Sequence, residues 1–170
     1  SRILPIRNTE NTQSQLKSEI VDSHLSLPDP IVIIGAKGAG KTTFIKYFTE
    51  IILDANIKKS KPIIYLDFRK YTHQDIENTQ LIYSRILEQI YDKYPDLNLT
   101  KLNILKTIYQ KDIQRNQDGI WAPLKNDNVA LDLKISTFIE GKLADNIAHL
   151  SAISMYLVNK CHKRLCIILD

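Results

Sequence analysis

The stretch that decides the fold is Ile31-Val32-Ile33-Ile34-Gly35-Ala36-Lys37-Gly38-Ala39-Gly40-Lys41-Thr42-Thr43. Its first four residues are apolar and β-branched, a pattern that predicts a buried parallel strand. Residues 35–42 then follow the pattern G-x-x-x-x-G-K-[ST], and three of the chain's five glycines lie in this loop. Apolar residues return at helical spacing after the loop, so we expect a helix from Lys41 to about Ala55. The order is therefore strand, glycine-rich loop, helix.

The residue types of this loop suit the binding of phosphate. Glycines let the backbone turn tightly, so that several N–H groups face one concavity, and the following helix adds the positive end of its dipole. Lys41 supplies a mobile cation for the β- and γ-phosphates, and the Thr42 hydroxyl is placed to bind Mg²⁺. The pattern resembles the Walker A loop of P-loop NTPases. We expect the nucleotide to contact Gly35, Ala36, Lys37, Gly38, Ala39, Gly40, Lys41, Thr42 and Thr43.

The resemblance also implies a carboxylate at the end of a neighbouring strand, the Walker B acid, which holds the water shell of Mg²⁺. Two apolar runs end in an aspartate: residues 62–67 end at Asp67 and residues 165–170 end at Asp170. Asp170 is favoured, because its run follows a helical crossover, whereas this superfamily usually places an edge strand where Asp67 lies. Thr42 and Asp170 are thus the expected metal-binding residues, and Lys41 and Asp170 the expected catalytic ones. Asp67, or an acid outside this sequence, is the alternative.

The rest of the chain predicts helices. Residues 74–94 carry apolar side chains at a spacing of four, and further helices follow, with an irregular loop at 116–128 and a break at Gly141. Trp121, within the irregular loop, is expected to cover a local core. We predict a three-layer α/β P-loop fold with a parallel sheet, in which residues 1–30 are a lead-in helix and linker and residues 31–170 are a partial core. Residues 74–163 would form a helical insertion between the second and third strands.

This long insertion resembles those of AAA+ and STAND-type ATPases. If the strand order resembles that of the additional-strand (ASCE) NTPases, one more strand lies between the strand at 31–34 and the strand at 165–169, and we find no segment that supplies it. The resemblance therefore implies that the fold is incomplete at its C-terminal end. It also implies that a catalytic glutamate, a sensor residue and an arginine finger lie beyond Asp170.

Composition sets looser bounds on the chain. Its 170 residues are enough for one domain, and a net charge of +4 with a pI of about 9.0 permits nucleic-acid contact without requiring it. No apolar run has the length of a membrane span, and the N-terminal residues lack the apolar core of a signal peptide. Cys161 and Cys166 fit no metal or disulfide pattern, so we expect a cytoplasmic protein. The four histidines show no metal spacing, so we expect surface or core residues.

The functional prediction is an ATP-binding module that hydrolyses ATP with Mg²⁺ to drive a conformational or assembly switch. Its helical insertion would be the surface for a protein partner or a second copy. ATP is expected because the segment 159–162 departs from the guanine-reading pattern of GTPases at His162. The alternatives are a small-molecule kinase, a nucleic-acid-stimulated motor or loader, and a nucleotide-binding scaffold without turnover.

Overall fold

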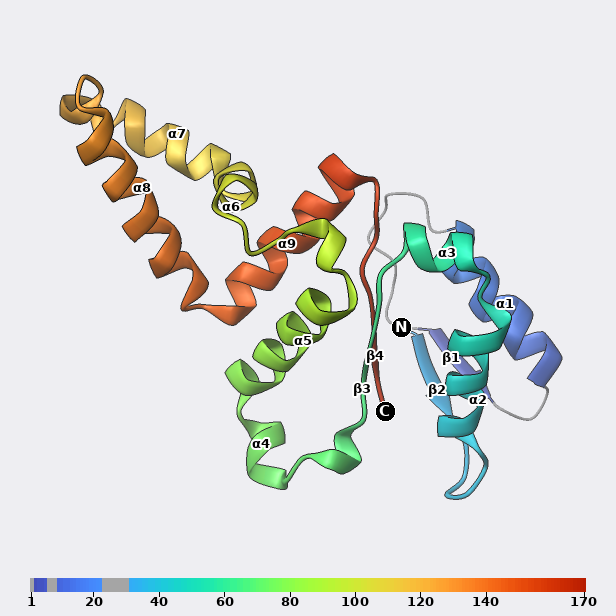
Figure 1. Cartoon of the computed structure of the whole chain (residues 1–170). Coiled ribbons are helices and arrows are strands. Elements are labelled where there is room, and N and C mark those ends of the chain that lie inside the picture. Colours follow the sequence, from blue (N-terminus) through green and yellow to red (C-terminus); the bar gives the residue numbers. More distant parts are fainter. Residues whose placement is uncertain (1, 6–8, 23–30) are drawn as a thin grey trace. The chain divides into compact units, whose positions relative to one another are not determined.

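The computed structural model describes residues 2–5, 9–22 and 31–170 (Figure 1). By its internal contacts the chain divides into two compact units, residues 1–61 and residues 62–170. The linker predicted before the first apolar strand falls at residues 23–30, outside the described part of the chain. No described helix combines the length and the hydropathy that a membrane span needs.

The first unit holds a two-stranded parallel sheet and the glycine-rich loop. Strand β1 (Arg2–Pro5) pairs with strand β2 (Ile31–Ile34), with Arg2 opposite Ile31 and Pro5 opposite Ile34. The helices of this unit are α1 (Thr9–Asp22), α2 (Lys41–Tyr47) and α3 (Ala55–Ser60), and the π-helical turn η1 (Phe48–Ile52) continues α2. Its buried apolar side chains include Leu16, Ile20, Phe44, Ile45, Phe48 and Leu53.

The helix after the loop is shorter than the sequence predicted. The backbone widens into the π-helical turn at Phe48, where the amide of Leu53 donates to the Phe48 carbonyl at 3.0 Å. The Thr49 hydroxyl donates to the Ile45 carbonyl at 2.9 Å, a bond that competes with the helix backbone. Asp54 then caps a new helix, α3, by accepting from the amides of Asn56 and Ile57.

The second unit holds the other parallel pair, strands β3 (Ile63–Leu66) and β4 (Cys166–Leu169), with Ile63 opposite Cys166 and Leu66 opposite Leu169. The chain between them is helical, with helix α5 (Thr79–Lys93) packed against helix α9 (Asn146–Cys161). The other elements are η2 (Phe68–Lys70), α4 (His73–Glu77), η3 (Pro95–Leu97), α6 (Leu102–Ile108), α7 (Gln110–Asp118), η4 (Ala122–Leu124) and α8 (Asn128–Leu143).

The helical part of this unit has two apolar clusters. The larger one joins β3 to α5 and α9 and contains Ile64, Leu66, Ile82, Ile86, Leu87, Ile90, Leu99, Leu150, Ile153 and Leu157. The smaller one joins α6, α7 and α8 and contains Leu105, Tyr109, Ile113, Trp121, Ile135 and Ile139. Trp121 is 7% exposed and meets the Phe138 ring edge-on at 5.6 Å between centroids. The prediction that it covers a local core is confirmed.

Two of the predicted helix boundaries are wrong. The helix expected over 74–94 is divided at Asn78, whose side chain accepts from the amide of Leu81 at 3.2 Å and so caps α5. The break expected at Gly141 does not occur, because α8 runs through it to Leu143. A single glycine weakens a helix without ending it when packing holds both sides, and Ile135 and Ile139 of α8 are buried in the smaller cluster.

The strands differ from the prediction in their surroundings. Residues 2–5 were assigned to the lead-in and not to a strand, yet β1 gives β2 a parallel neighbour. The expectation of full burial is also wrong, because Ile34 and Leu169 are 49% and 56% exposed. Each strand that the structure describes is hydrogen-bonded along one edge only, so none is enclosed within a wide sheet.

Candidate functional site

The loop between β2 and α2 is shaped by its glycines. Gly38 and Gly40 have φ angles of 81° and 77°, the left-handed region that favours glycine. A Cβ added at Gly35 would lie 3.3 Å from the Cβ of Ala39, so this glycine permits a close approach. The amide of Ala39 donates to the Ala36 carbonyl at 3.1 Å and closes a tight turn. All three glycines of the predicted motif are therefore explained by local geometry.

Lys41 lies at the first position of α2 and folds back over this loop. Its ammonium nitrogen Nζ donates to the carbonyls of Gly35 at 2.8 Å and of Ala36 at 3.1 Å. The amides of Gly38, Gly40 and Lys41 donate to no backbone carbonyl among the residues that the structure describes. The loop thus gathers a lysine cation and uncommitted amide donors, the groups that bind phosphate oxygens.

The remaining loop residues extend this arrangement into the helix. Thr42 is half-buried and Thr43 is exposed, both within the first turn of α2. Lys37 is exposed at the tip of the loop. Residues 35–43, the predicted nucleotide-binding set, therefore form one continuous segment of the first unit.

Asp170, the preferred Walker B candidate, belongs to the second unit and follows β4 directly. Its backbone makes two hydrogen bonds to the neighbouring segment: its amide donates to the Leu66 carbonyl at 2.9 Å, and its carbonyl accepts from the amide of Phe68 at 2.6 Å. Its carboxylate oxygen Oδ2 accepts a hydrogen bond of 2.5 Å from the hydroxyl of Tyr65 on β3. Burial, followed by the hydrogen bond to Asp170, raises the pKa of the Tyr65 hydroxyl well above its usual range.

Asp67, the other candidate, ends the neighbouring strand and has a different partner. Arg69 binds both of its oxygens, through Nε at 2.7 Å and Nη2 at 2.6 Å, and the backbone amide of Arg69 donates to it at 3.2 Å. These hydrogen bonds, chiefly the side-chain pair, lower the pKa of Asp67 to about 2. The Asp67 carboxylate is therefore committed to a bidentate ion pair, whereas Asp170 has a neutral hydroxyl for a partner.

Sequence reasoning did not find the partners of either aspartate. The Asp67–Arg69 pair has a local signal in the sequence. The two residues are two positions apart, and the tight turn η2 begins directly after Asp67. The Tyr65–Asp170 contact follows from the register. Tyr65 lies opposite Ile168, so Asp170, which is two residues after Ile168 and follows β4 directly, has its side chain on the same face of the sheet. A single sequence does not disclose that register.

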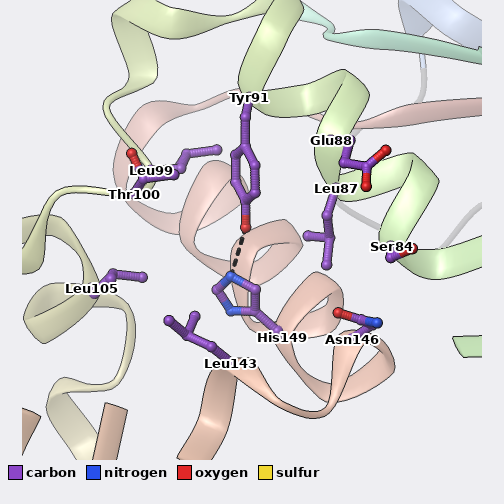
Figure 2. A pocket seen from close by; sticks show the side chains of 10 residues that line it. All are labelled: Ser84, Leu87, Glu88, Tyr91, Leu99, Thr100, Leu105, Leu143, Asn146 and His149. Carbon is purple, nitrogen blue, oxygen red and sulfur yellow. Dashed lines mark hydrogen bonds between the residues drawn. The ribbon is translucent and has the colours of Figure 1, made fainter. Parts of the chain in front are cut away.

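A separate cavity of about 300 Å³ lies in the helical part of the second unit (Figure 2). Its lining comes from α5, α9 and the segments beside them, and consists of Ser84, Leu87, Glu88, Tyr91, Leu99, Thr100, Leu105, Leu143, Asn146 and His149. His149 is 2% exposed, and its Nε2 lies 2.9 Å from the Tyr91 hydroxyl and its Nδ1 2.7 Å from the Tyr109 hydroxyl. Burial lowers the pKa of His149 and raises the pKa of Tyr109 to about 12.

Most of the polar side chains that line this cavity have hydrogen-bond partners within the chain. The Asn146 side chain donates to the Gln80 carbonyl, the Ser84 hydroxyl to the Leu81 carbonyl, and Glu88 pairs with Arg85. Both ring nitrogens of His149 are also engaged. His149 is thus a buried core residue, and its hydrogen bonds join α9 to Tyr91 of α5 and to Tyr109, which follows α6.

A comparison with protein-family models shows which family the chain belongs to. The family model described as "AAA domain" matches residues 28–118, more than half of the chain. The chain belongs to the AAA domain family. No curated protein and no solved structure matches it.

The AAA-domain match spans β2, the glycine-rich loop, α2, β3 and the helices as far as α7. It supports an AAA-type P-loop NTPase-like region and indicates a nucleotide-binding, ATPase-like function. Tyr65, Asp67 and Arg69 lie within the matched residues, and Asp170 lies after them. The glycine-rich loop at residues 35–42 also lies within the matched residues.

The donors that would hold Mg²⁺ suit that ion by their chemistry. Thr42 offers a hydroxyl oxygen and Asp170 a carboxylate oxygen, and Mg²⁺ prefers oxygen donors. It is commonly held by one or two protein side chains together with substrate phosphates and water. Within residues 2–5, 9–22 and 31–170, no group of three or more His, Cys, Asp or Glu side chains is placed to hold a metal.

Proposed function

We propose that this AAA domain binds ATP with Mg²⁺ and hydrolyses it, transferring the γ-phosphoryl group to water. The observation that carries the proposal is the position of Lys41, whose ammonium lies 2.8 Å and 3.1 Å from two carbonyls of a loop set by two left-handed glycines. An ammonium held by neutral carbonyls is poised to exchange them for charged phosphate oxygens, which are the stronger acceptors.

Each residue of the site has a distinct part in this proposal. The amides of residues 35–43 would surround the phosphates, and Lys41 would neutralise charge that develops on the β- and γ-phosphate oxygens. The Thr42 hydroxyl and the Asp170 carboxylate would hold Mg²⁺, Asp170 by way of water. The metal would supply charge neutralisation and orientation of the phosphates. The protein's contribution is positioning and electrostatic stabilisation.

We further propose that turnover drives a change of conformation or assembly through the helices between β3 and β4. Support comes from exposed apolar side chains at the N-terminal end of α8 and in the segment between α7 and α8. Ile120, Val129 and Leu133 are 79%, 82% and 68% exposed, and Val129 and Leu133 lie one turn apart on one side of the helix. Exposed apolar side chains of this size are suited to contact with a protein partner or a second copy of the chain.

Product analysis tests the reaction. Release of free phosphate from Mg-ATP, lost in Lys41→Ala and retained in Lys46→Ala, is the expected result. Lys46 is the matched control, because it is a lysine of the same helix outside the loop. A phosphorylated metabolite in place of free phosphate would instead indicate a kinase. Turnover that depends on added DNA or RNA would indicate a nucleic-acid motor.

A further inference from the structure

The two aspartates at the ends of β3 and β4 are held by different kinds of partner. Asp67 and Asp170 are opposite one another at the same edge of a parallel pair, since Leu66 is opposite Leu169. Arg69 binds both oxygens of Asp67. The Tyr65 hydroxyl donates to one oxygen of Asp170, at 2.5 Å. The tyrosine bond therefore leaves Oδ1 of Asp170 as the oxygen for a further partner.

The hydrogen bond from Tyr65 restrains the side chain of Asp170, and the backbone of Asp170 is already held by other hydrogen bonds. Hydrogen bonds to Leu66 and from Phe68 hold the Asp170 backbone against β3. The remaining freedom is rotation of the carboxylate, and the Tyr65 bond restricts it. The acceptor of this bond is a carboxylate, and hydrogen bonds to charged acceptors are stronger than those between neutral groups.

We propose that Tyr65 is a positioning residue for the metal site: it holds Oδ2 of Asp170 and leaves Oδ1 as the oxygen that would meet the water shell of Mg²⁺. The inference rests on the proposed function, because it takes Asp170 as the carboxylate of that site. Partners that orient metal-binding carboxylates set metal affinity, and their loss typically lowers that affinity by about 10- to 100-fold. Tyr65 acts through Asp170 in this proposal, so we expect its loss to leave metal-free nucleotide binding unchanged.

The test separates metal affinity from nucleotide affinity in the full chain. Binding of a fluorescent ATP analogue is titrated in EDTA and again at rising Mg²⁺ concentration, for wild type, Tyr65→Phe and Asp170→Asn. In Tyr65→Phe we expect the Mg²⁺ midpoint to rise about tenfold while the affinity in EDTA changes less than twofold. Because Tyr65 acts through Asp170, Tyr65→Phe adds nothing further to Asp170→Asn in the double variant.

Tyr94→Phe is the matched control, since it removes a hydroxyl that also bonds to β3. The amide of Ile63, at the other end of the strand, donates to the Tyr94 hydroxyl at 2.7 Å. This variant loses a comparable hydrogen bond and keeps the wild-type Mg²⁺ midpoint. Thermal unfolding checks that each variant is folded, and Tyr65→Leu, which also lacks a donor, replaces Tyr65→Phe if that variant does not fold.

The outcomes distinguish the inference from the proposed function. If Asp170→Asn raises the Mg²⁺ midpoint and Tyr65→Phe does not, the positioning role is wrong while the proposed site stands. An equal rise in Tyr65→Phe and Tyr94→Phe also overturns it, because the effect then reflects general weakening of β3. If wild type binds no nucleotide under either condition, the proposed function itself fails, and the inference with it.

Discussion

The same substitution at two glycines is expected to have opposite effects on stability. Gly40 has a φ of 77°, and Gly141 lies inside α8; at both positions an added Cβ has no atom within 4 Å. Steric clash is therefore absent in both cases, and only the backbone distinguishes them. Gly40→Ala forces a left-handed conformation that costs about 1–2 kcal/mol. Gly141→Ala gains about 0.8–1 kcal/mol of helix propensity.

The assay is urea unfolding followed by far-UV circular dichroism, with wild type and both variants at the same pH. We expect the free energy of unfolding to fall in Gly40→Ala and to rise in Gly141→Ala, a separation of about 2–3 kcal/mol between the variants. Gly38→Ala, at a φ of 81°, is a replicate of the first variant. Equal shifts for Gly40→Ala and Gly141→Ala would refute the loop geometry on which the phosphate site depends.

Three further predictions concern the second unit. Burial lowers the pKa of His149 in the folded chain. Below about pH 6.5, the His149 side chain is therefore protonated in the unfolded chain before it is protonated in the folded chain. The free energy of unfolding then falls by up to about 1.4 kcal/mol per pH unit as the pH drops below that value, and His149→Gln flattens this slope in urea titrations at pH 5.5 and 7.5. Trp121→Ala removes a large side chain from the smaller cluster and costs about 3–5 kcal/mol, measured by circular dichroism. Arg69→Ala raises the pKa of Asp67 from about 2 toward its ordinary value near 4, measured by NMR titration, and removes the stability that this pair contributes above that pH range.

A specific result would contradict each of these three predictions. Unchanged acid sensitivity in His149→Gln would mean that this residue does not titrate in the window assigned to it. A near-neutral Trp121→Ala would contradict its burial at 7% exposure. An Asp67 pKa unmoved by loss of Arg69 would exclude the bidentate pair as its cause.

Apolar runs and the loop motif were predictable because local chemistry determines them. The strands at 31–34, 63–66 and 166–169 each have a continuous apolar sequence bounded by turn residues or charge. The glycine positions follow from φ angles that other residues rarely adopt. Helix type was predictable over 79–93 for the same reason, since a period of four puts its apolar residues on one face.

Features that depend on distant partners were not predictable. β1 is a short run that includes Arg2 and Pro5, and only its pairing with β2 defines it as a strand. Gly141 resembles a helix break in isolation, but the packing of α8 overrides its low propensity. The contact between Tyr65 and Asp170 joins residues 105 positions apart and requires the strand register.

The most direct test of the central claim is a calorimetric titration of the full chain with Mg-ATP. The loop geometry around Lys41 predicts measurable binding by wild type and by Lys46→Ala, and an affinity about 10- to 100-fold weaker in Lys41→Ala, the loss expected for hydrogen bonds to a charged group. Absence of binding by wild type, or equal affinity in Lys41→Ala, would contradict the account.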